Sequence, residues 1–529
     1  MKKSLLDSIR FDEPYTRFEL LETEQAGTPP FFARWKERRR EKQDEHRTVF
    51  SALRENRARL ERQYFAAENT DLILRSVRVG GTVEALVVFM NGMADETQIN
   101  DFILRPLLDA HLDGVRAAQY AAYLMQNVLE MQEAERRDDW ETVQTAISEG
   151  RTAVFLDGCK EAVLLDTRGY VSRSIPESKN EAVVMGPHEA FTEHLRNNVT
   201  QLRRILKMPA FVCRFREAGG QNRTKLVVAY RAGVCNPNLL AEVTRRLDAI
   251  DVDQIVSGGT IEQLIEDHTY LPMPQMLKTE RPDRAAAGIM QGKVVLLVEG
   301  SPLACVLPVT LGTLLSSAED TYMRQPVGTL VRLVRIVGAL LSILMPAFFL
   351  ALALHHQGQL SSEVLATVTA SRVMVYMPLP VEMIFLLLVF QLVREAGLRV
   401  PGSIGYAVGI IGGLVLGQAA VAANIVSTVV LIIVALSGLG NFTIPDYSTQ
   451  VCVVYYRILL CVAATMGGLL GIGAALLLTI AVLSSVKSFG VPFFAPLAPV
   501  TMHKASLFVR GKVQNNRRVT DYMNPEVHP

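Results

Sequence analysis

Residues Val400–Pro445 read VPGSIGYAVGIIGGLVLGQAAVAANIVSTVVLIIVALSGLGNFTIP and contain no charged side chain. A helix needs about 20 mainly apolar residues to cross the hydrocarbon core of a bilayer. The stretch is therefore long enough for two membrane-spanning helices, joined by a tight turn that we expect near Ala420–Asn424. It predicts that this part of the chain lies in a lipid bilayer.

Further apolar runs lie on both sides of this stretch. Ile336–Leu354 predicts one span, and Val373–Val393 predicts another if Glu382 can be accommodated in the bilayer. Ile458–Val486 is either one long tilted helix or a helix followed by a re-entrant piece. We therefore expect an all-α polytopic membrane domain at 294–500, with four to six spans.

The charged residues are concentrated before this region. The chain of 529 residues has 54 Lys and Arg and 53 Asp and Glu, and only 15 of them lie in 294–500. A soluble domain averages about 25% charged residues, so the first 293 residues are expected to be soluble. The net charge of +1 argues neither for nor against a nucleic-acid partner, and we expect none.

Strand-like and helix-like segments alternate in this soluble head and predict two α/β subdomains. The first, at 66–150, contains the strand-like stretch DLILRSVRV from Asp71 and a helix opened by Asp95. The second, at 151–293, begins with a hairpin-like pair, TAVFLDG and EAVLLDT.

Charged segments form both ends of the chain. Residues 1–65 are a charged extension, either a solvated helix or a contact for anionic lipid headgroups or an acidic partner, and residues 501–529 are a basic tail. The N-terminus has no apolar stretch long enough for a signal peptide. Basic residues precede the first span and follow the second. Head and tail are therefore both expected on the cytoplasmic side, which requires an even number of crossings.

No sequence motif indicates catalysis. The six cysteines form neither a CxxC pair nor a cluster with metal-ligand spacing, and the chain has no P-loop, GxGxxG or HExxH. No paired-carboxylate, Ser-His-Asp or Cys-His arrangement is supported by proximity in sequence. We expect no enzyme activity, metal or cofactor, and the residues alone indicate a component of a receptor, channel or transporter.

Four glycines recur every four residues in the charge-free stretch: Gly405, Gly409, Gly413 and Gly417. Such a stripe lets helix backbones approach closely in lipid. It indicates either tight packing against a neighbouring helix or subunit at the centre of an assembly, or ordinary packing within the chain.

Glu382 is the only acidic residue inside a predicted span. An ionised carboxylate in the bilayer is costly, so it either lines an ion pathway or pairs with Arg372 or Arg394 near a membrane edge. Pro378 and Pro380 suggest that the helix starts late, which favours the structural pairing.

Other charges are expected at the membrane edges. Arg457 begins the last long apolar run and Lys487 ends it, so both are expected to extend their side chains to the interface. Glu395 is assigned with Arg372 and Arg394 to the same class of interfacial charges.

Eight stretches between Asn91 and Pro499 resemble the signatures of one known family. They are, in order, NGMADETQINDFILRPLL from Asn91, EAVVMGPHEAFTEHLRNNVTQLRRILK at Glu181–Lys207, IEQLIEDHTYLPMPQMLKTERPD at Ile261–Asp283, VEGSP at Val298–Pro302, SSAEDTYMR at Ser316–Arg324, REAGLRVPGSIGYAVGIIGGLVLGQAAV at Arg394–Val421, FTIP at Phe442–Pro445 and VKSFGVPFFAPLAP at Val486–Pro499. The family that they resemble is the A subunits of nutrient germinant receptors in spore-forming bacteria (the GerA family).

The resemblance implies a role in spore germination. It implies a location in the inner spore membrane, with the head and tail in the spore core. The implied partners are membrane lipid, a permease-like B subunit that binds the nutrient, and a lipoprotein C subunit. It also implies a homo-oligomer, expected as a pentamer, that forms a nutrient-gated ion channel. The alternative is an auxiliary scaffold of the same family that amplifies germination without sensing nutrient.

This chain departs from the family pattern after Arg372, where the pattern carries several acidic residues. Glu382 remains, but Val373, Leu387 and Gln391 occupy positions where carboxylates are expected. Rings of carboxylates select cations. Glu382 and Gln391 are thus the candidate ion-pathway residues, and the loss of the other carboxylates weakens cation selection for this chain.

Overall fold

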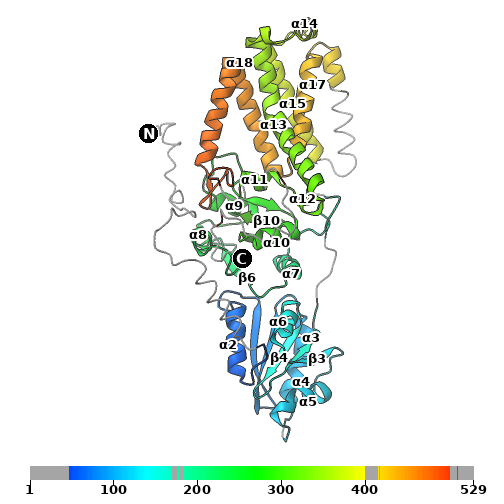
Figure 1. Ribbon diagram of the computed structural model, residues 1–529, viewed down its shortest axis with the longest axis vertical. Coiled ribbons are helices and arrows are strands. Elements are labelled where there is room, and N and C mark those ends of the chain that lie inside the picture. The colour runs from blue at the N-terminus through cyan, green and yellow to red at the C-terminus, as the bar shows by residue number, and fades with distance from the viewer. Residues whose placement is uncertain are drawn as a thin grey trace.

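The computed structural model describes residues 47–112, 114–169, 176–178, 180–181, 183–399, 415, 417–500, 509 and 523. They form an elongated molecule of three tiers, with one α/β subdomain at one end, a second in the middle and a helical bundle at the other end (Figure 1). The prediction of a two-subdomain α/β head followed by an all-α region is confirmed.

The first subdomain is an antiparallel five-stranded sheet with strand order β1-β2-β4-β5-β3, covered by helices on both faces. Alternate residues of a strand point to opposite faces. Leu86 and Val88 of β2 accordingly pack beneath α2 and α6, whereas Ala85 and Val87 pack beneath α3, α4 and α5. The elements are α2 Leu53–Gln63, β1 Leu72–Val79, β2 Val83–Met90, α3 Glu96–Ile99, η1 Asn100–Leu104, α4 Arg105–Asp109, η2 Ala117–Gln119, α5 Tyr120–Asn127, β3 Ala134–Arg137, α6 Trp140–Ser148, β4 Thr152–Leu156 and β5 Ala162–Leu165.

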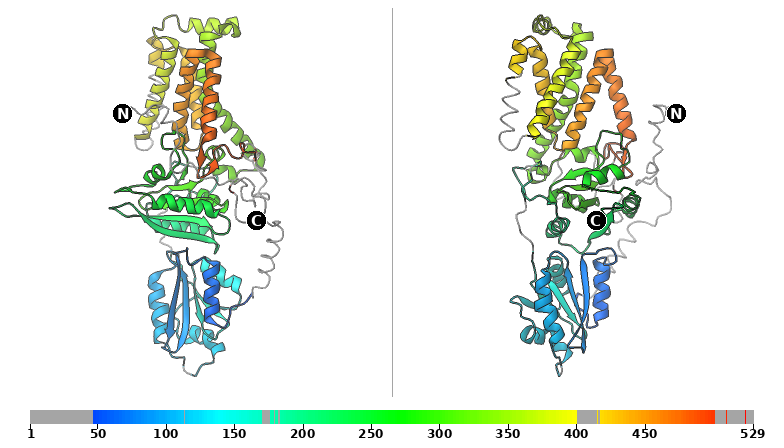
Figure 2. Two further views of the ribbon diagram at one scale, coloured as in Figure 1. Left: turned by 90° about the vertical axis from the view of Figure 1, so that its left-hand side faces the viewer. Right: turned by 180° about the vertical axis from the view of Figure 1, so that it is seen from behind.

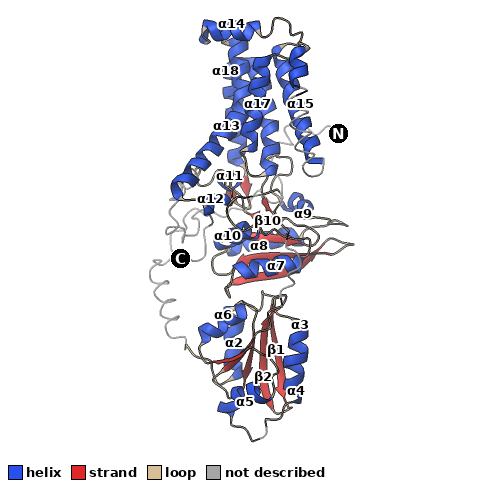
Figure 3. Cartoon of the chain, turned by 90° about the vertical axis from the view of Figure 1, so that its right-hand side faces the viewer, coloured by secondary structure: helices blue, strands red, loops and turns tan. Residues whose placement is uncertain are grey.

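The second subdomain repeats this design, with strand order β6-β7-β9-β10-β8 and α7 and α10 on one face and α8 and α9 on the other. In each subdomain a helix, a β-hairpin, helical segments, a single strand, a helix and a second hairpin follow one another. Figure 3 shows the two sheets in successive tiers beneath the bundle. The elements are α7 Leu195–Ile205, β6 Phe211–Ala218, β7 Thr224–Arg231, α8 Pro237–Asp248, α9 Gly258–Ile265, β8 Leu277–Thr279, α10 Pro282–Met290, β9 Val294–Val298 and β10 Ala304–Leu307.

Because of this repeat, both boundaries of the second subdomain differ from the predicted ones. The hairpin of β4 and β5, expected to open that subdomain at 151, instead pairs with β2 and β3 in the first sheet. The hairpin of β9 and β10, expected within a membrane domain from 294, lies inside the second sheet. Apolar periodicity identifies a hairpin, but it does not reveal which distant strand the hairpin will pair with.

The bundle contains, among the described residues, two helices long and apolar enough to cross a membrane, α13 and α18. These two helices pack along each other, and α14 lies across the far end of the bundle (Figures 1 and 2). The elements are α11 Leu311–Leu315, α12 Glu319–Tyr322, α13 Gln325–His355, η3 Gln357–Gln359, α14 Ser362–Ala370, α15 Leu379–Arg399, α17 Thr428–Phe442, α18 Tyr447–Ser485, β11 Lys487–Ser488 and β12 Val491–Pro492.

Helix α18 is a helical hairpin rather than a tilted helix or a helix with a re-entrant piece. Its backbone is non-helical at Gly467 and Gly468, and Gly468 has φ +55°. A Cβ atom placed on Gly471 would lie 2.1 Å from the carbonyl oxygen of Ala463, which is possible only if the chain folds back on itself. The second expected span, α15, begins at Leu379, as the nearby prolines indicated. The number of spans stays a prediction.

Candidate functional site

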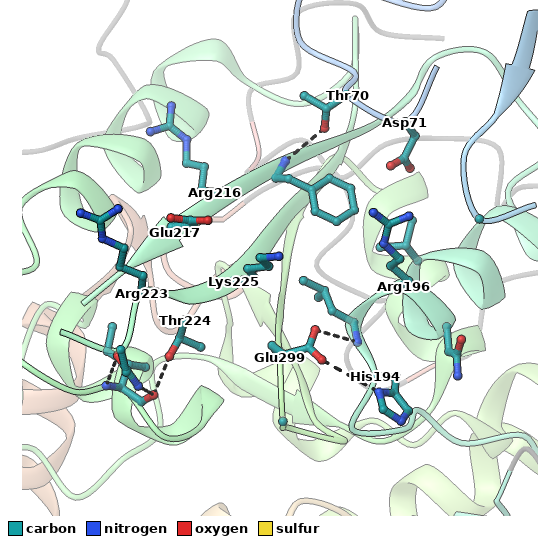
Figure 4. A pocket seen from close by; sticks show the side chains of 18 of the residues that line it. Thr70, Asp71, His194, Arg196, Arg216, Glu217, Arg223, Thr224, Lys225 and Glu299 are labelled. Atoms are coloured by element: carbon teal, nitrogen blue, oxygen red, sulfur yellow. Dashed lines mark hydrogen bonds and ion pairs between the residues drawn. The ribbon is translucent and has the colours of Figure 1, made fainter. Parts of the chain in front are cut away.

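A cleft of about 1250 Å³ lies between the two subdomains of the head (Figure 4). The first subdomain contributes the end of β2 at Asn91 and the start of β1 at Asp71. The second contributes the N-terminus of α7, the β6–β7 hairpin and the loop before α9. A concave site of this size between two subdomains is a candidate for binding small molecules.

Glu299 holds together the residues that form one wall of this cleft. Its Oε2 accepts a hydrogen bond from the backbone N–H of Leu195, 3.2 Å away, and its Oε1 lies 4.0 Å from Nδ1 of His194. The next residue of α7, Arg196, donates from Nη1 to Oδ1 of Asn91 at 3.0 Å and so reaches the first subdomain. A carboxylate at the start of an 11-residue helix is favourable because the helix dipole is positive there.

Other charges in the cleft are available to a ligand. Lys225 lies near its middle (Figure 4), and its side chain has no ion-pair partner within the described ranges. The same is true of Arg223, whereas Arg216 is paired with Asp248 at 2.5 Å. Lys225 and Arg223, together with the Glu299 carboxylate in the same cleft, can bind a small polar molecule that carries both charges, or an anion.

The sequence did not reveal this cleft. Two stretches noted for their family resemblance contain its wall residues His194 and Glu299. Asp71 and Asn91, which line the cleft from the first subdomain, lie about 100 residues or more away in the chain. Nothing in the local pattern of either segment predicts that they meet.

Glu382 has structural partners in the bundle. It is fully buried at the start of α15, and its Oε1 accepts hydrogen bonds from the backbone N–H and the hydroxyl of Ser427, at 2.6 and 2.7 Å. Its Oε2 lies 3.3 Å from Nε of Arg372. Ser427 is the N-cap of α17, so this carboxylate ties two helices together. These contacts favour the structural pairing with Arg372 over an ion pathway.

The other predicted interfacial charges of α15, Arg394 and Glu395, have different partners from Glu382. Arg394 lies over the ring of Tyr447, 5.5 Å from its centroid, rather than against Glu382. Glu395 forms an exposed pair with Arg399 at 2.9 Å. Gln391 is half-buried on α15 between these charges and Glu382, and its place on an ion pathway stays a proposal.

Arg457 is buried in the bundle rather than extended to its edge. Its exposed fraction is 2%, and its Nη2 donates to the hydroxyl of Ser342 on α13. Helices α13 and α18 pack closely here and enclose the guanidinium group, which the local sequence could not show. Lys487 lies in β11, just beyond the end of α18, where the chain re-enters the head.

The glycine stripe falls mostly outside the described residues, which include only its last member, Gly417. A Cβ on Gly417 would make ordinary contact with Leu431 at 3.6 Å. Helices α17 and α13 approach each other closely at glycines that the sequence did not single out: a Cβ on Gly440 of α17 would lie 2.4 Å from the carbonyl oxygen of Gly338 on α13.

No metal site accompanies these features: within the described ranges, no group of three His, Cys, Asp or Glu side chains could hold an ion. A two-subdomain α/β head joined to a bundle with helices able to cross a membrane defines a membrane-associated protein with a soluble, cleft-bearing head. Residues 60–521 match the family described as Bacillus/Clostridium GerA spore germination protein. The chain belongs to this family.

Individual relatives are similar over most of the chain. Spore germination protein KA of Bacillus subtilis (strain 168) is 32% identical over 434 residues, 82% of this chain and 79% of that protein. Spore germination protein GerLA of Bacillus cereus is 33% identical over 433 residues, 81% of this chain and 87% of that protein. The crystal structure of the N-terminal domain of the A subunit of the Bacillus megaterium spore germinant receptor GerK3 aligns with 49% of this chain and 95% of its own, at 24% identity and a TM-score of 0.40.

Proposed function

We propose that this chain is the A subunit of a nutrient germinant receptor and that it forms part of a nutrient-gated ion channel. Its partners in this proposal are a permease-like B subunit, a lipoprotein C subunit and further copies of itself. The site of action is the inner spore membrane, with the head and the C-terminal tail on the spore-core side.

One observation carries this proposal: the family match spans residues 60–521 and so includes both the head and the helical bundle. Relatives that match about four-fifths of the chain are named as spore germination proteins. The head supplies a cleft in which a ligand or a partner segment can bind, and the bundle supplies helices that can cross a membrane. A receptor subunit requires both parts.

The test is potassium release from purified spores, wild type against a strain lacking this gene, across a panel of amino acids and sugars. We expect the deletion to abolish release for at least one nutrient and to leave release for others intact. An unchanged nutrient profile would contradict the proposal. Complementation with the wild-type gene is the control for effects of the deletion on neighbouring genes.

An auxiliary scaffold that amplifies germination is the second candidate. Stage V sporulation protein AF of Bacillus subtilis (strain 168), a relative not named as a germination protein, is 27% identical to this chain, against 32% and 33% for the two germination proteins above. In the same experiment a scaffold predicts slower release for every nutrient and complete loss for none.

A further inference from the structure

After α18, the last membrane-type helix, the chain returns from the bundle to the second subdomain of the head. Residues 486–495, here called the strap, follow α18 and form the small hairpin of β11 and β12. Phe489 and Val491 enter one apolar core of the second subdomain, and Phe493 enters the core on the other face of the same sheet. The strap is therefore an integral part of the head.

The turn of this hairpin carries an unusual residue. Phe489 and Gly490 are its two central residues, with φ +46° and +78°. Two-residue hairpin turns with both φ values positive favour Asn or Asp followed by Gly, because a bulky side chain is strained there. Phe489 is nevertheless fully buried, with its ring centroid 4.4 Å from the guanidinium of Arg246. Backbone strain of this kind persists where surrounding contacts enforce it.

Asp267 supplies those contacts. Its Oδ2 accepts the backbone N–H of Phe489 at 2.8 Å, and its Oδ1 accepts Nη2 of Arg246 at 2.6 Å. Arg246 also pairs with Glu242 on its own helix, α8. All of these side chains are buried, so the strap is fixed to α8 by charge-assisted hydrogen bonds away from solvent.

The strap also holds the segment that leads into the first membrane-type helix. The hydroxyl of Ser488 accepts a hydrogen bond from the backbone N–H of Val309 at 3.0 Å and donates to the carbonyl of Gln275 at 2.7 Å. The carbonyl of Phe493 accepts the N–H of Leu311, the first residue of α11, at 2.9 Å. Segments entering and leaving the bundle are thus bonded to one element.

The apolar core that contains Phe489 extends to the wall of the cleft. Ile255 lines the cleft and is packed in the same apolar core as Phe489. Close-packed interiors transmit displacement rather than absorb it. A movement of the cleft wall at Ile255 therefore acts on the core that contains the strap.

We propose that the strap is a clamp that makes the second subdomain move as one body with α13 and α18, with Asp267 as the positioning residue. The inference rests on the proposed receptor function for its biological meaning: a signal raised in the head would reach the membrane helices through this clamp. Asp267 acts through the Phe489 backbone.

The test compares two chemically identical changes three residues apart. Ser488→Ala removes both hydroxyl contacts of the strap. Ser485→Ala is the matched control, because the exposed Ser485 hydroxyl bonds only to the carbonyl of Val482 in its own helix. Phe489→Asn is the second variant: it suits the turn but removes the buried ring.

Two measurements are made on each variant: hydrogen–deuterium exchange of the purified full-length chain in detergent, and nutrient-evoked potassium release from spores with matched protein amounts. We expect Ser488→Ala to speed exchange at Val309 and Leu311 about fivefold to tenfold, as for the loss of one or two buried hydrogen bonds. Potassium release falls several-fold, Phe489→Asn gives the same pattern, and Ser485→Ala changes neither measurement.

Every other outcome contradicts the proposal that the strap is a clamp. Unchanged exchange in both strap variants shows that the strap does not fix the lead-in segment. Faster exchange with release equal to that of Ser485→Ala shows that the strap is only structural. The receptor proposal fails by a separate result, a deletion strain with an unchanged nutrient profile, and exchange then still decides whether the strap holds Val309 and Leu311.

Discussion

Arg203 of α7 and Asp71 at the start of β1 form an ion pair across the boundary of the two head subdomains, with Nε and Oδ2 3.0 Å apart. Their side chains are only 3% and 4% exposed. Nη2 of Arg203 also donates to Oδ1 of Asn69 at 3.0 Å, so the first subdomain supplies two acceptors for one buried cation. This pair joins the subdomains beside the cleft.

Replacing Asp71 by Ala is expected to destabilise the head, because it leaves the Arg203 guanidinium buried without a counter-charge. Breaking one partner of a buried pair costs about 3–5 kcal/mol. Thermal unfolding of the purified full-length chain, followed by circular dichroism, measures the loss. The exposed pair of Arg57 and Glu61 is the control: Glu61→Ala should cost about 0.3–0.5 kcal/mol. Equal losses for the two variants would contradict the structural role of the Arg203–Asp71 pair.

Lys293 gives the head a pH-dependent stability. Its side chain is fully buried, its Nζ donates to the hydroxyl of Thr313 at 3.2 Å, and burial, reinforced by the charge of Arg284, lowers its pKa to about 7. The pKa in the unfolded chain is about 10.4. Between these values this lysine binds more protons in the unfolded chain, so its own contribution to the free energy of unfolding rises with pH from about 7 to about 10.

The expected rise is on the order of 4 kcal/mol over that window, since each pKa unit corresponds to about 1.4 kcal/mol. Lys293→Met should remove most of this slope and stabilise the head most strongly at pH 7 and below. Urea unfolding of the full-length chain at several pH values measures it. Lys225→Met, at the exposed lysine in the cleft, should leave the slope unchanged. If the difference in the free energy of unfolding between the wild-type chain and Lys293→Met did not change with pH, Lys293 would keep its ordinary pKa.

Much of the fold follows from local sequence patterns. Asp95 caps α3 by accepting the backbone N–H groups of Thr97 and Gln98, and the hairpin of β4 and β5 forms as the alternation predicts. Charge-free runs locate the helices of the bundle for the same reason, because composition is a local property. These features required no knowledge of distant contacts.

The features that sequence analysis missed all depend on distant contacts. The reversal of α18 requires two adjacent glycines, which the sequence contains, but a helix through Gly467 and Gly468 is equally compatible with their apolar neighbours. The burial of Phe489 depends on Arg246, more than 200 residues earlier in the chain. The cleft likewise combines segments that carry no shared local pattern.

Glu382 can be assigned to structure or to ion conduction by two substitutions. Glu382→Gln keeps an acceptor for Ser427 but removes the charge opposite Arg372, whereas Glu382→Ala removes both. If the residue is structural, Ala should lower the melting temperature of the purified chain more than Gln, because it also leaves the N-terminus of α17 unsatisfied. The ion selectivity of release from spores should stay unchanged in both. A Gln variant with wild-type stability but altered ion release would place Glu382 on the pathway.

Substitutions at Gly440 and Gly417 distinguish helix packing within one chain from helix packing between copies of the chain. Gly440→Ala places a Cβ 2.4 Å from the carbonyl oxygen of Gly338, far inside van der Waals contact, so α13 and α17 must move apart. We expect this variant to lose about 1–3 kcal/mol of stability, as overpacked cores do, and to reach the membrane in smaller amounts.

Gly417→Ala meets only Leu431 at 3.6 Å among the described residues, so the isolated chain should unfold at the wild-type temperature. Crosslinking in membranes then tests the stripe that Gly417 completes: if this face packs against a second copy, Gly417→Ala lowers the yield of crosslinked oligomer while the chain remains stable. An unchanged yield would contradict packing of this face against a second copy.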